Sequence, residues 1–217
     1  MTATHAHLDI AALKRRHPLE FFVTLVNNQP MGFYPVETLK QDARRFGVPF
    51  LNPCVNRSVV RAAPEDGAAR LELGMIKDIG AESARLIVEE RERHSPYAGA
   101  DELARRVGLK PQSVRSLIEA GAFDALTPNR RQALWEAGLP LRPTRAGQRA
   151  FSLEGANPPP RFDDFTDYER MVGEYRALGV YPRGHVMEFI RPTLDADVLT
   201  TTEAYDCADG ERIRVAG

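Results

Sequence analysis

The chain has 217 residues, of which 43% are hydrophobic and 27% are charged, a composition typical of a soluble globular protein with one or two domains. Its net charge of -1 at pH 7 argues against a protein that binds nucleic acid through bulk charge alone. No apolar run is long enough for a membrane span and no signal peptide is recognisable, so we expect a cytoplasmic protein without membrane contact.

The cysteine and histidine residues show no pattern of a metal site. Cys54 and Cys207 are isolated thiols without the paired spacing of zinc ligands, which suits a reducing compartment. His5 and His7 lie near the N-terminus, where a frayed chain end is the favoured interpretation. We therefore expect no metal ligands and no cofactor in this chain.

Three amphipathic helices are predicted near the N-terminus. The first covers residues 8–16, the second begins at Pro18, and the third begins at Pro35 and stops at Gly47. Residues 48–55 have strand-like character. Residues 61–69, rich in Ala, Pro, Asp and Gly, are interpreted as a linker.

The most informative pattern lies in residues 73–91, LGMIKDIGAESARLIVEER. Gly80 can adopt a positive φ and lets another backbone or an anion come close. The apolar spacing around it predicts two closely packed helices joined by a tight hairpin. The amides of about residues 80–83 would then lie at the positive end of the second helix, which attracts anions. The alternative is an ordinary glycine that ends one helix before another.

Residues 101–126 repeat this arrangement imperfectly. A predicted helix ends at a turn with Gly108, and Pro111 begins another helix that faces the core through Val114, Leu117 and Ile118. Gly108 thus takes the place that Gly80 has in the first hairpin.

The remaining third of the chain is less regular. Thr127-Pro128 predicts the start of a helix that reaches about residue 137, whereas residues 139–162 contain five prolines and lack any helical or strand period. Asp163-Asp164 is interpreted as the cap of the next helix. Asp195-Ala196-Asp197 has the spacing of a metal-binding pair, but its surroundings favour a solvated loop.

Charge is unevenly distributed along the sequence. Residues 1–62 contain eight Lys or Arg against four acidic residues, residues 70–136 contain eleven against eleven, and residues 137–217 contain ten against thirteen. The first two thirds are therefore the better candidates for contact with a polyanion.

The bend at Gly80 resembles the helix-hairpin-helix motif, which grips the DNA sugar-phosphate backbone without reading sequence. The order of the segments resembles the bacterial C-family DNA polymerases, of the polymerase III alpha-subunit type. The matching strings are NNQPMGFY (27–34), LIEAGAFDAL (117–126), ALGVYPRGH (177–185) and GERIRVAG (210–217). Within this family, residues 29–34 are similar to the error-prone, damage-tolerant branch. One departure is Asp78, because the motif usually has glycine there.

This resemblance implies contacts between the two hairpins and DNA phosphates. Gly80 and Ala81 would act through backbone amides, and Lys77, Arg85 and Lys110 through charge. The candidate DNA-binding residues are Lys77, Gly80, Ala81, Ser83, Arg85, Gly108, Lys110 and Ser113.

The resemblance also implies where the chemistry is expected. C-family polymerases use palm-domain aspartates that hold two magnesium ions, and these residues would lie upstream of Met1. No catalytic residue is therefore expected in this chain, and magnesium is expected for the full polymerase only.

The expected partners are a duplex primer-template and the remainder of the polymerase. A sliding clamp is a further possibility, because Gln148-Arg149-Ala150-Phe151-Ser152-Leu153 loosely resembles a clamp-binding motif. A plain linker is the alternative for this hexapeptide.

The sequence thus predicts a mainly α-helical fold in four parts. These are a fingers-like helical segment (1–62), a tandem helix-hairpin-helix region (63–138), a linker (139–163) and a helical lead into a truncated OB domain (164–217). The predicted function is the DNA-binding portion of an error-prone polymerase. The alternatives are a fragment of the replicative alpha subunit, a free-standing helix-hairpin-helix repair module and a helical protein-interaction domain.

Overall fold

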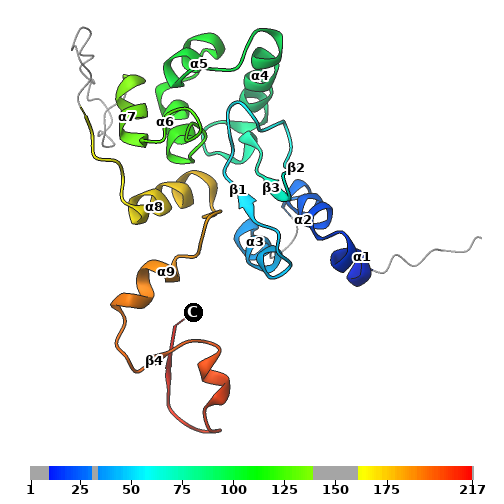
Figure 1. Cartoon of the computed structure of the whole chain (residues 1–217), viewed down its shortest axis with the longest axis vertical. Coiled ribbons are helices and arrows are strands. Elements are labelled where there is room, and N and C mark those ends of the chain that lie inside the picture. The colour runs from blue at the N-terminus through cyan, green and yellow to red at the C-terminus, as the bar shows by residue number, and fades with distance from the viewer. Residues whose placement is uncertain (1–9, 31–33, 139–160, 217) are drawn as a thin grey trace, which may run out of the picture. The chain divides into compact units, whose positions relative to one another are not determined.

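The computed structural model describes residues 10–30, 34–138 and 161–216. The chain divides into two compact units, Met1–Arg183 and Gly184–Gly217, and each is considered by itself. The first unit consists mainly of helices with one small sheet (Figure 1). Its helices are α1 (Ile10–Arg16), α2 (Pro18–Asn27), α3 (Val36–Arg45), the 3-10 turn η1 (Leu73–Met75), α4 (Gly80–Arg93), α5 (Ala100–Val107), α6 (Pro111–Glu119), α7 (Arg130–Glu136) and α8 (Asp167–Leu178).

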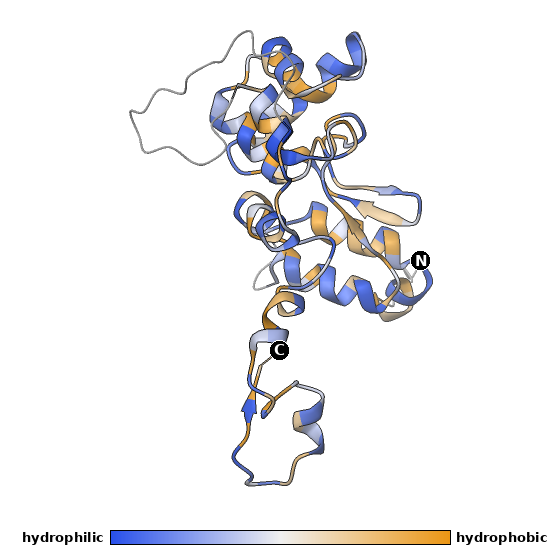
Figure 2. Cartoon of the chain, turned by 60° about the vertical axis from the view of Figure 1, so that its left-hand side comes forward, coloured by the Kyte–Doolittle hydropathy of each residue, from blue (hydrophilic) through white to orange (hydrophobic). Residues whose placement is uncertain are grey.

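The predicted mainly α fold is confirmed, and the apolar faces predicted for α2, α4 and α6 are buried, whereas α1 has no buried residue. Figure 2 shows hydrophobic and hydrophilic residues on the same helices, as amphipathic helices require. The apolar stripes of α2, α4 and α6 join one hydrophobic core. Its members on these helices are Phe22, Val23, Val26, Ala84, Ile87, Val88, Val114, Leu117 and Ile118.

The three-stranded sheet corrects the prediction of a linker at residues 61–69. Strands β2 (Ala63–Glu65) and β3 (Ala68–Arg70) pair antiparallel, and β3 pairs parallel with β1 (Phe50–Leu51), in the order β1-β3-β2. Asp66 and Gly67, both with positive φ, form the two-residue turn. The Asp-Gly pair is a strong hairpin signal, so the sequence did contain the information.

This sheet also crosses the expected division between residues 62 and 63. Because β1 precedes that point and β3 follows it, both segments contribute to the same sheet and core. The structure instead divides the chain after Arg183.

Several helix starts differ from the prediction. Pro35 is the N-cap of α3 and not its first helical residue. Asn129, whose side chain accepts a hydrogen bond from the Gln132 amide, caps α7 in place of the expected Thr127-Pro128 start. The first helix of the hairpin at Gly80 is reduced to the single turn η1.

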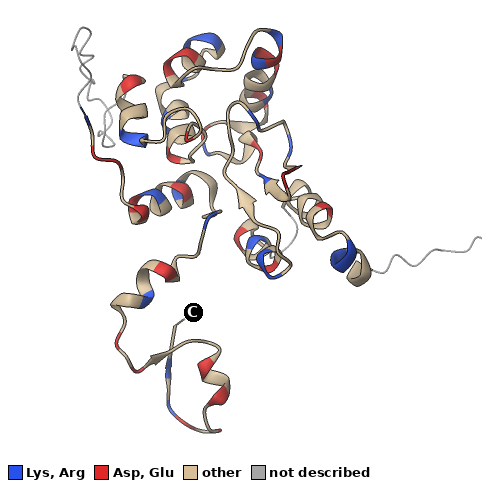
Figure 3. Cartoon of the chain, viewed as in Figure 1, with Lys and Arg blue, Asp and Glu red and all other residues tan. Residues whose placement is uncertain are grey.

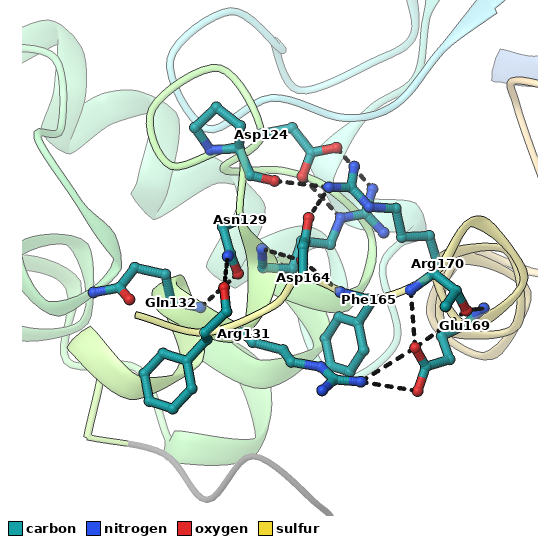
Figure 4. Close-up of polar contacts among 12 residues, drawn as sticks. Asp124, Asn129, Arg131, Gln132, Asp164, Phe165, Glu169 and Arg170 are labelled. Carbon is teal, nitrogen blue, oxygen red and sulfur yellow. Dashed lines mark hydrogen bonds and ion pairs between the residues drawn. The ribbon is translucent and has the colours of Figure 1, made fainter. Parts of the chain in front are cut away.

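Helix α8 is capped by Thr166 and not by Asp163-Asp164. Thr166 and Glu169 form a reciprocal capping box, whereas Asp164 accepts a hydrogen bond from the Arg130 amide at 2.9 Å, at the start of α7. Figure 4 shows Arg170 lying close to Asp164 and Arg131 pointing toward Glu169. Asp164 therefore ties the two helices together.

A buried ion network underlies this junction. Arg130 is only 1% exposed, and its guanidinium lies 2.7 Å from the Asp124 carboxylate and 2.6 Å from that of Glu174, which is fully buried. Arg183 reaches the same Glu174 oxygen at 2.5 Å. Gly121 leaves room for this contact, because a Cβ there would lie 2.3 Å from Arg130 Nη2.

The second unit is small and mostly exposed. It contains α9 (Met187–Ile190), the 3-10 turns η2 (Arg191–Thr193) and η3 (Glu203–Asp206), and a parallel pair of strands, β4 (Val198–Leu199) and β5 (Arg214–Val215). Asp195 and Asp197 are exposed and both pair with Arg214. Their predicted role as a solvated loop agrees with these contacts.

We predict that Arg130→Ala lowers the free energy of unfolding by about 3–5 kcal/mol, because it leaves two carboxylates without their buried partner. The neighbouring Arg131→Ala is the matched control, since it breaks an ion pair whose side chains are 33% and 44% exposed. We expect the control to lose at most about 1 kcal/mol. Urea denaturation measures both, and equal losses would contradict a structural role specific to Arg130.

A second prediction concerns alkaline pH. Burial, and then the nearby Glu37 carboxylate, raise the pKa of Tyr175 to about 12. The unfolded value is about 10, so the stability linked to the neutral phenol is complete below pH 10 and is lost as the pH rises toward 12. Tyr175→Phe should therefore make the loss of unfolding free energy between pH 10 and 12 less steep than in the wild type. Parallel curves for the two proteins would contradict this linkage.

Candidate nucleic-acid interface

The bend between η1 and α4 is fixed on its inner side by buried side chains and a backbone hydrogen bond, and its outer side is exposed to solvent. Ile76 and Ile79 are buried, and the Lys77 amide donates to the Ala177 carbonyl of α8 at 2.8 Å. Asp78 and Gly80 both have a left-handed conformation, with φ of +65° and +63°. The chain therefore turns sharply at this point and enters α4 with Gly80 on the surface.

The first amides of α4 are available to a ligand. Gly80, Ala81 and Glu82 are exposed, and their N–H groups have no hydrogen-bond partner among the residues that the structure describes. A Cβ built on Gly80 meets nothing within 4 Å. Unpaired amides at a helix N-terminus together form a site for anions. The predicted exposure of this bend is confirmed.

Asp78 points to the second hairpin. Its carboxylate accepts hydrogen bonds from Ser116 Oγ at 3.0 Å and Gln112 Nε2 at 3.4 Å, both on α6. Its carbonyl accepts a third, from Ser113 Oγ at 2.8 Å. The residue that departs from the usual glycine thus joins the two hairpins. Nothing in the spacing of the sequence indicated this contact between residues more than thirty positions apart.

The second hairpin differs from the first in the use of its glycine. Gly108 is the left-handed C-cap of α5, and its amide donates to the Ala104 carbonyl at 2.9 Å. The expectation that Gly108 is equivalent to Gly80 is therefore wrong for the amide, which is already engaged. Ser113 is only 8% exposed, and its hydroxyl serves the contact with Asp78.

The charged candidates divide into two groups. Lys77 and Lys110 are exposed, and no ion pair involves them within the described residues. Arg85 is also exposed but pairs with Glu89 one turn later, at 3.0 Å. Ser83 is half-buried, and Glu82 adds an exposed negative charge in the first turn of α4. Backbone amides, more than net charge, characterise this surface.

A metal site and a membrane-spanning helix are the two other features considered. Across the described ranges, no group of three or more His, Cys, Asp and Glu side chains could hold a metal ion. Likewise, none of the helices described is long and apolar enough to cross a membrane. The candidate clamp-binding hexapeptide, residues 148–153, lies outside the described residues.

Comparison with known proteins identifies the motif and the relatives. A family model described as "Helix-hairpin-helix motif" matches residues 47–133. The error-prone DNA polymerase of Corynebacterium efficiens is 38% identical over 211 residues, which are 95% of this chain and 19% of that protein. Error-prone DNA polymerases of Mycobacterium tuberculosis and Burkholderia pseudomallei are 35% and 37% identical over 95% and 99% of this chain.

The chain spans about a fifth of the length of these curated relatives, 19% to 21% of each. The resemblance to the error-prone branch of the bacterial C-family DNA polymerases is confirmed over almost the whole chain.

We predict that Asp78→Ala destabilises the protein more than Asp78→Asn does, because alanine loses both the left-handed conformation and the contact with Ser116. Alanine tolerates the left-handed conformation poorly, at a cost of about 1–2 kcal/mol, whereas asparagine tolerates it well. Asparagine also keeps an oxygen that can accept from Ser116. We therefore expect Asp78→Ala to lower the free energy of unfolding by about 2 kcal/mol or more, and Asp78→Asn by less than about 1 kcal/mol. Equal stabilities of the two variants in urea denaturation would show that neither the left-handed conformation nor the contact of Asp78 with Ser116 stabilises the fold.

Proposed function

Because the chain matches error-prone DNA polymerases along almost its whole length and contains a helix-hairpin-helix motif, we propose that it grips duplex DNA within such a polymerase. The single observation that carries this proposal is the set of exposed, unpartnered amides of Gly80, Ala81 and Glu82 within the described part of the bend. They would bind the phosphates of the primer-template without reading its sequence.

The charge of the region supports weak, non-specific binding. Residues 70–136 contain equal numbers of basic and acidic residues, so they attract DNA little over long distances. We expect a dissociation constant in the range of about 10⁻⁴ to 10⁻⁶ M, as is typical of non-specific contacts. A polymerase benefits from such contacts because it must move along any sequence, including damaged template. We therefore propose a role in translesion synthesis during damage tolerance and repair.

Catalysis is proposed for the whole polymerase and not for the residues described in this chain. The Asp195 and Asp197 carboxylates are directed to the exposed Arg214 guanidinium, so this pair does not fit a two-magnesium centre. The cytoplasm, where bacterial DNA lies, is the compartment that the proposed role requires.

Two alternative functions, a free-standing repair module and a helical protein-interaction domain, explain less of the similarity and of the structure. A free-standing repair module accounts for the motif at residues 47–133 but not for the similarity on both sides of it. A helical protein-interaction domain requires no exposed amides at the bend. Binding of DNA that weakens as salt rises would separate the proposed function from the interaction domain, because displaced counterions produce that dependence.

We predict that Gly80→Val reduces the affinity for duplex DNA at least about tenfold, since a branched side chain would occupy the place of the phosphate and resist positive φ. Gly67→Val is the matched control, because Gly67 also has positive φ and open space at its Cβ but lies in the β2–β3 turn. Fluorescence anisotropy with a labelled duplex measures the affinity, and circular dichroism checks the helices.

Unchanged affinity in Gly80→Val, with the helices intact, would reject the bend as the DNA site. If Gly67→Val loses as much affinity for the duplex as Gly80→Val, the loss is caused by backbone strain in general and not by the position of Gly80. Selective loss in Gly80→Val would support the proposal.

A further inference from the structure

A second positively charged surface lies outside the hairpins, where the last turns of α1 and α3 meet. We call it the basic corner and define it by Lys14, Arg15, Arg16, Arg44 and Arg45. Figure 3 shows Lys and Arg in blue on α1 and α3. The four arginines are exposed, whereas Lys14 is half-buried.

Lys14 holds the corner together. Its ammonium group lies 2.5 Å from the Asp42 carboxylate of α3, and 4.6 Å and 5.4 Å from the ring centres of Phe46 and Phe22. A cation over aromatic faces is attracted by their electron density, so these contacts fix the end of α1 against the end of α3. The ends of α1 and α3, which both carry arginines, therefore meet at Lys14.

The corner has a surplus of positive charge. Helices α1, α2 and α3 together contain six basic residues, Lys14, Arg15, Arg16, Lys40, Arg44 and Arg45, and three acidic ones, Glu20, Glu37 and Asp42, which leaves a net charge of +3. Glu37 pairs with the buried Lys40, and Asp42 pairs with Lys14. Within the described residues, Arg15, Arg16 and Arg45 have no ion pair.

Helix dipoles account for only part of this surplus. Basic residues in the last turn of a helix are stabilised by its negative end, which is the simplest explanation for arginines at these positions. Each helix end corresponds to only about half a negative charge, however, so two ends offset about one of the positive charges. The corner therefore keeps a net positive charge, which attracts anions.

We propose that the basic corner binds phosphates of duplex DNA, as a contact separate from the hairpins. Guanidinium groups match the geometry of phosphate oxygens and are always charged, so exposed arginines on two helix ends are suited to a polyanion with regularly spaced phosphates. The corner lies in the same compact unit as the hairpins. This inference rests on the proposed function, since it concerns the same class of ligand.

The test compares two double variants of the full chain that lose the same charge. Arg16→Gln/Arg45→Gln removes one arginine from each helix end of the corner. Arg93→Gln/Arg176→Gln removes two exposed arginines that pair with Glu89 and Glu119 elsewhere in the unit. Affinity for a labelled duplex is measured over a series of salt concentrations, and thermal unfolding checks that both variants fold.

We expect the corner variant to bind duplex more weakly at low salt. The slope of the logarithm of its binding constant against the logarithm of the salt concentration should be smaller in magnitude by between about 1 and 2, since each lost phosphate contact lowers that slope by about 0.9. The control variant should keep the slope of the wild type. An unchanged slope in the folded corner variant would overturn the proposal, and so would a loss seen only with single-stranded DNA.

The outcome is distinguishable from that of the hairpin test. If Gly80→Val abolishes binding while the corner variant behaves as the wild type, the corner fails and the proposed function stands. If the corner variant loses affinity while Gly80→Val binds normally, the hairpin assignment fails and the corner stands.

Discussion

The structure depends on one buried guanidinium. Arg130 bonds to Asp124 in the turn after α6 and to Glu174 on α8, and Gly121 is small enough to permit this approach. Taking these charges out of water is costly unless each is paired in good geometry, so the network tolerates few alternative arrangements of α6, α7 and α8. Burial alone would lower the pKa of Arg130, but the two carboxylates outweigh it and raise the pKa, which keeps the group charged.

That arrangement positions the candidate interface. Helix α8 provides the Ala177 carbonyl that fixes the Lys77 amide, and α6 provides the serines that hold Asp78. The backbone at the bend is thus secured from two sides while its outer amides face solvent. Preformed amides need no ordering when an anion binds, and they recognise a phosphate without any base. This division of roles is consistent with a surface that holds many DNA sequences equally.

The hairpins and the basic corner would contribute in different ways. Short-range amides determine where a phosphate sits, whereas exposed arginines attract a polyanion over a distance of about 10 Å at moderate salt. The balanced charge of the hairpin region therefore does not conflict with a role on DNA, because the surplus charge lies on α1 and α3. In the relatives, of which this chain spans about a fifth, both surfaces would act beside the remaining parts of a polymerase.

Sequence periodicity determined the faces that α2, α4 and α6 bury, because these depend on neighbours three or four positions apart. It therefore identified the stripes of α2, α4 and α6 and the exposed bend at Gly80. The β2–β3 hairpin was within reach of the sequence through its Asp-Gly turn but was taken for a linker. Only the tertiary structure decided that the Gly108 amide is engaged, that Asp78 bridges to α6, and that Arg130 and Glu174 meet in the core. The physical reason is that such contacts join residues far apart in the chain, so they are selected by packing and by the need to pair every buried polar group.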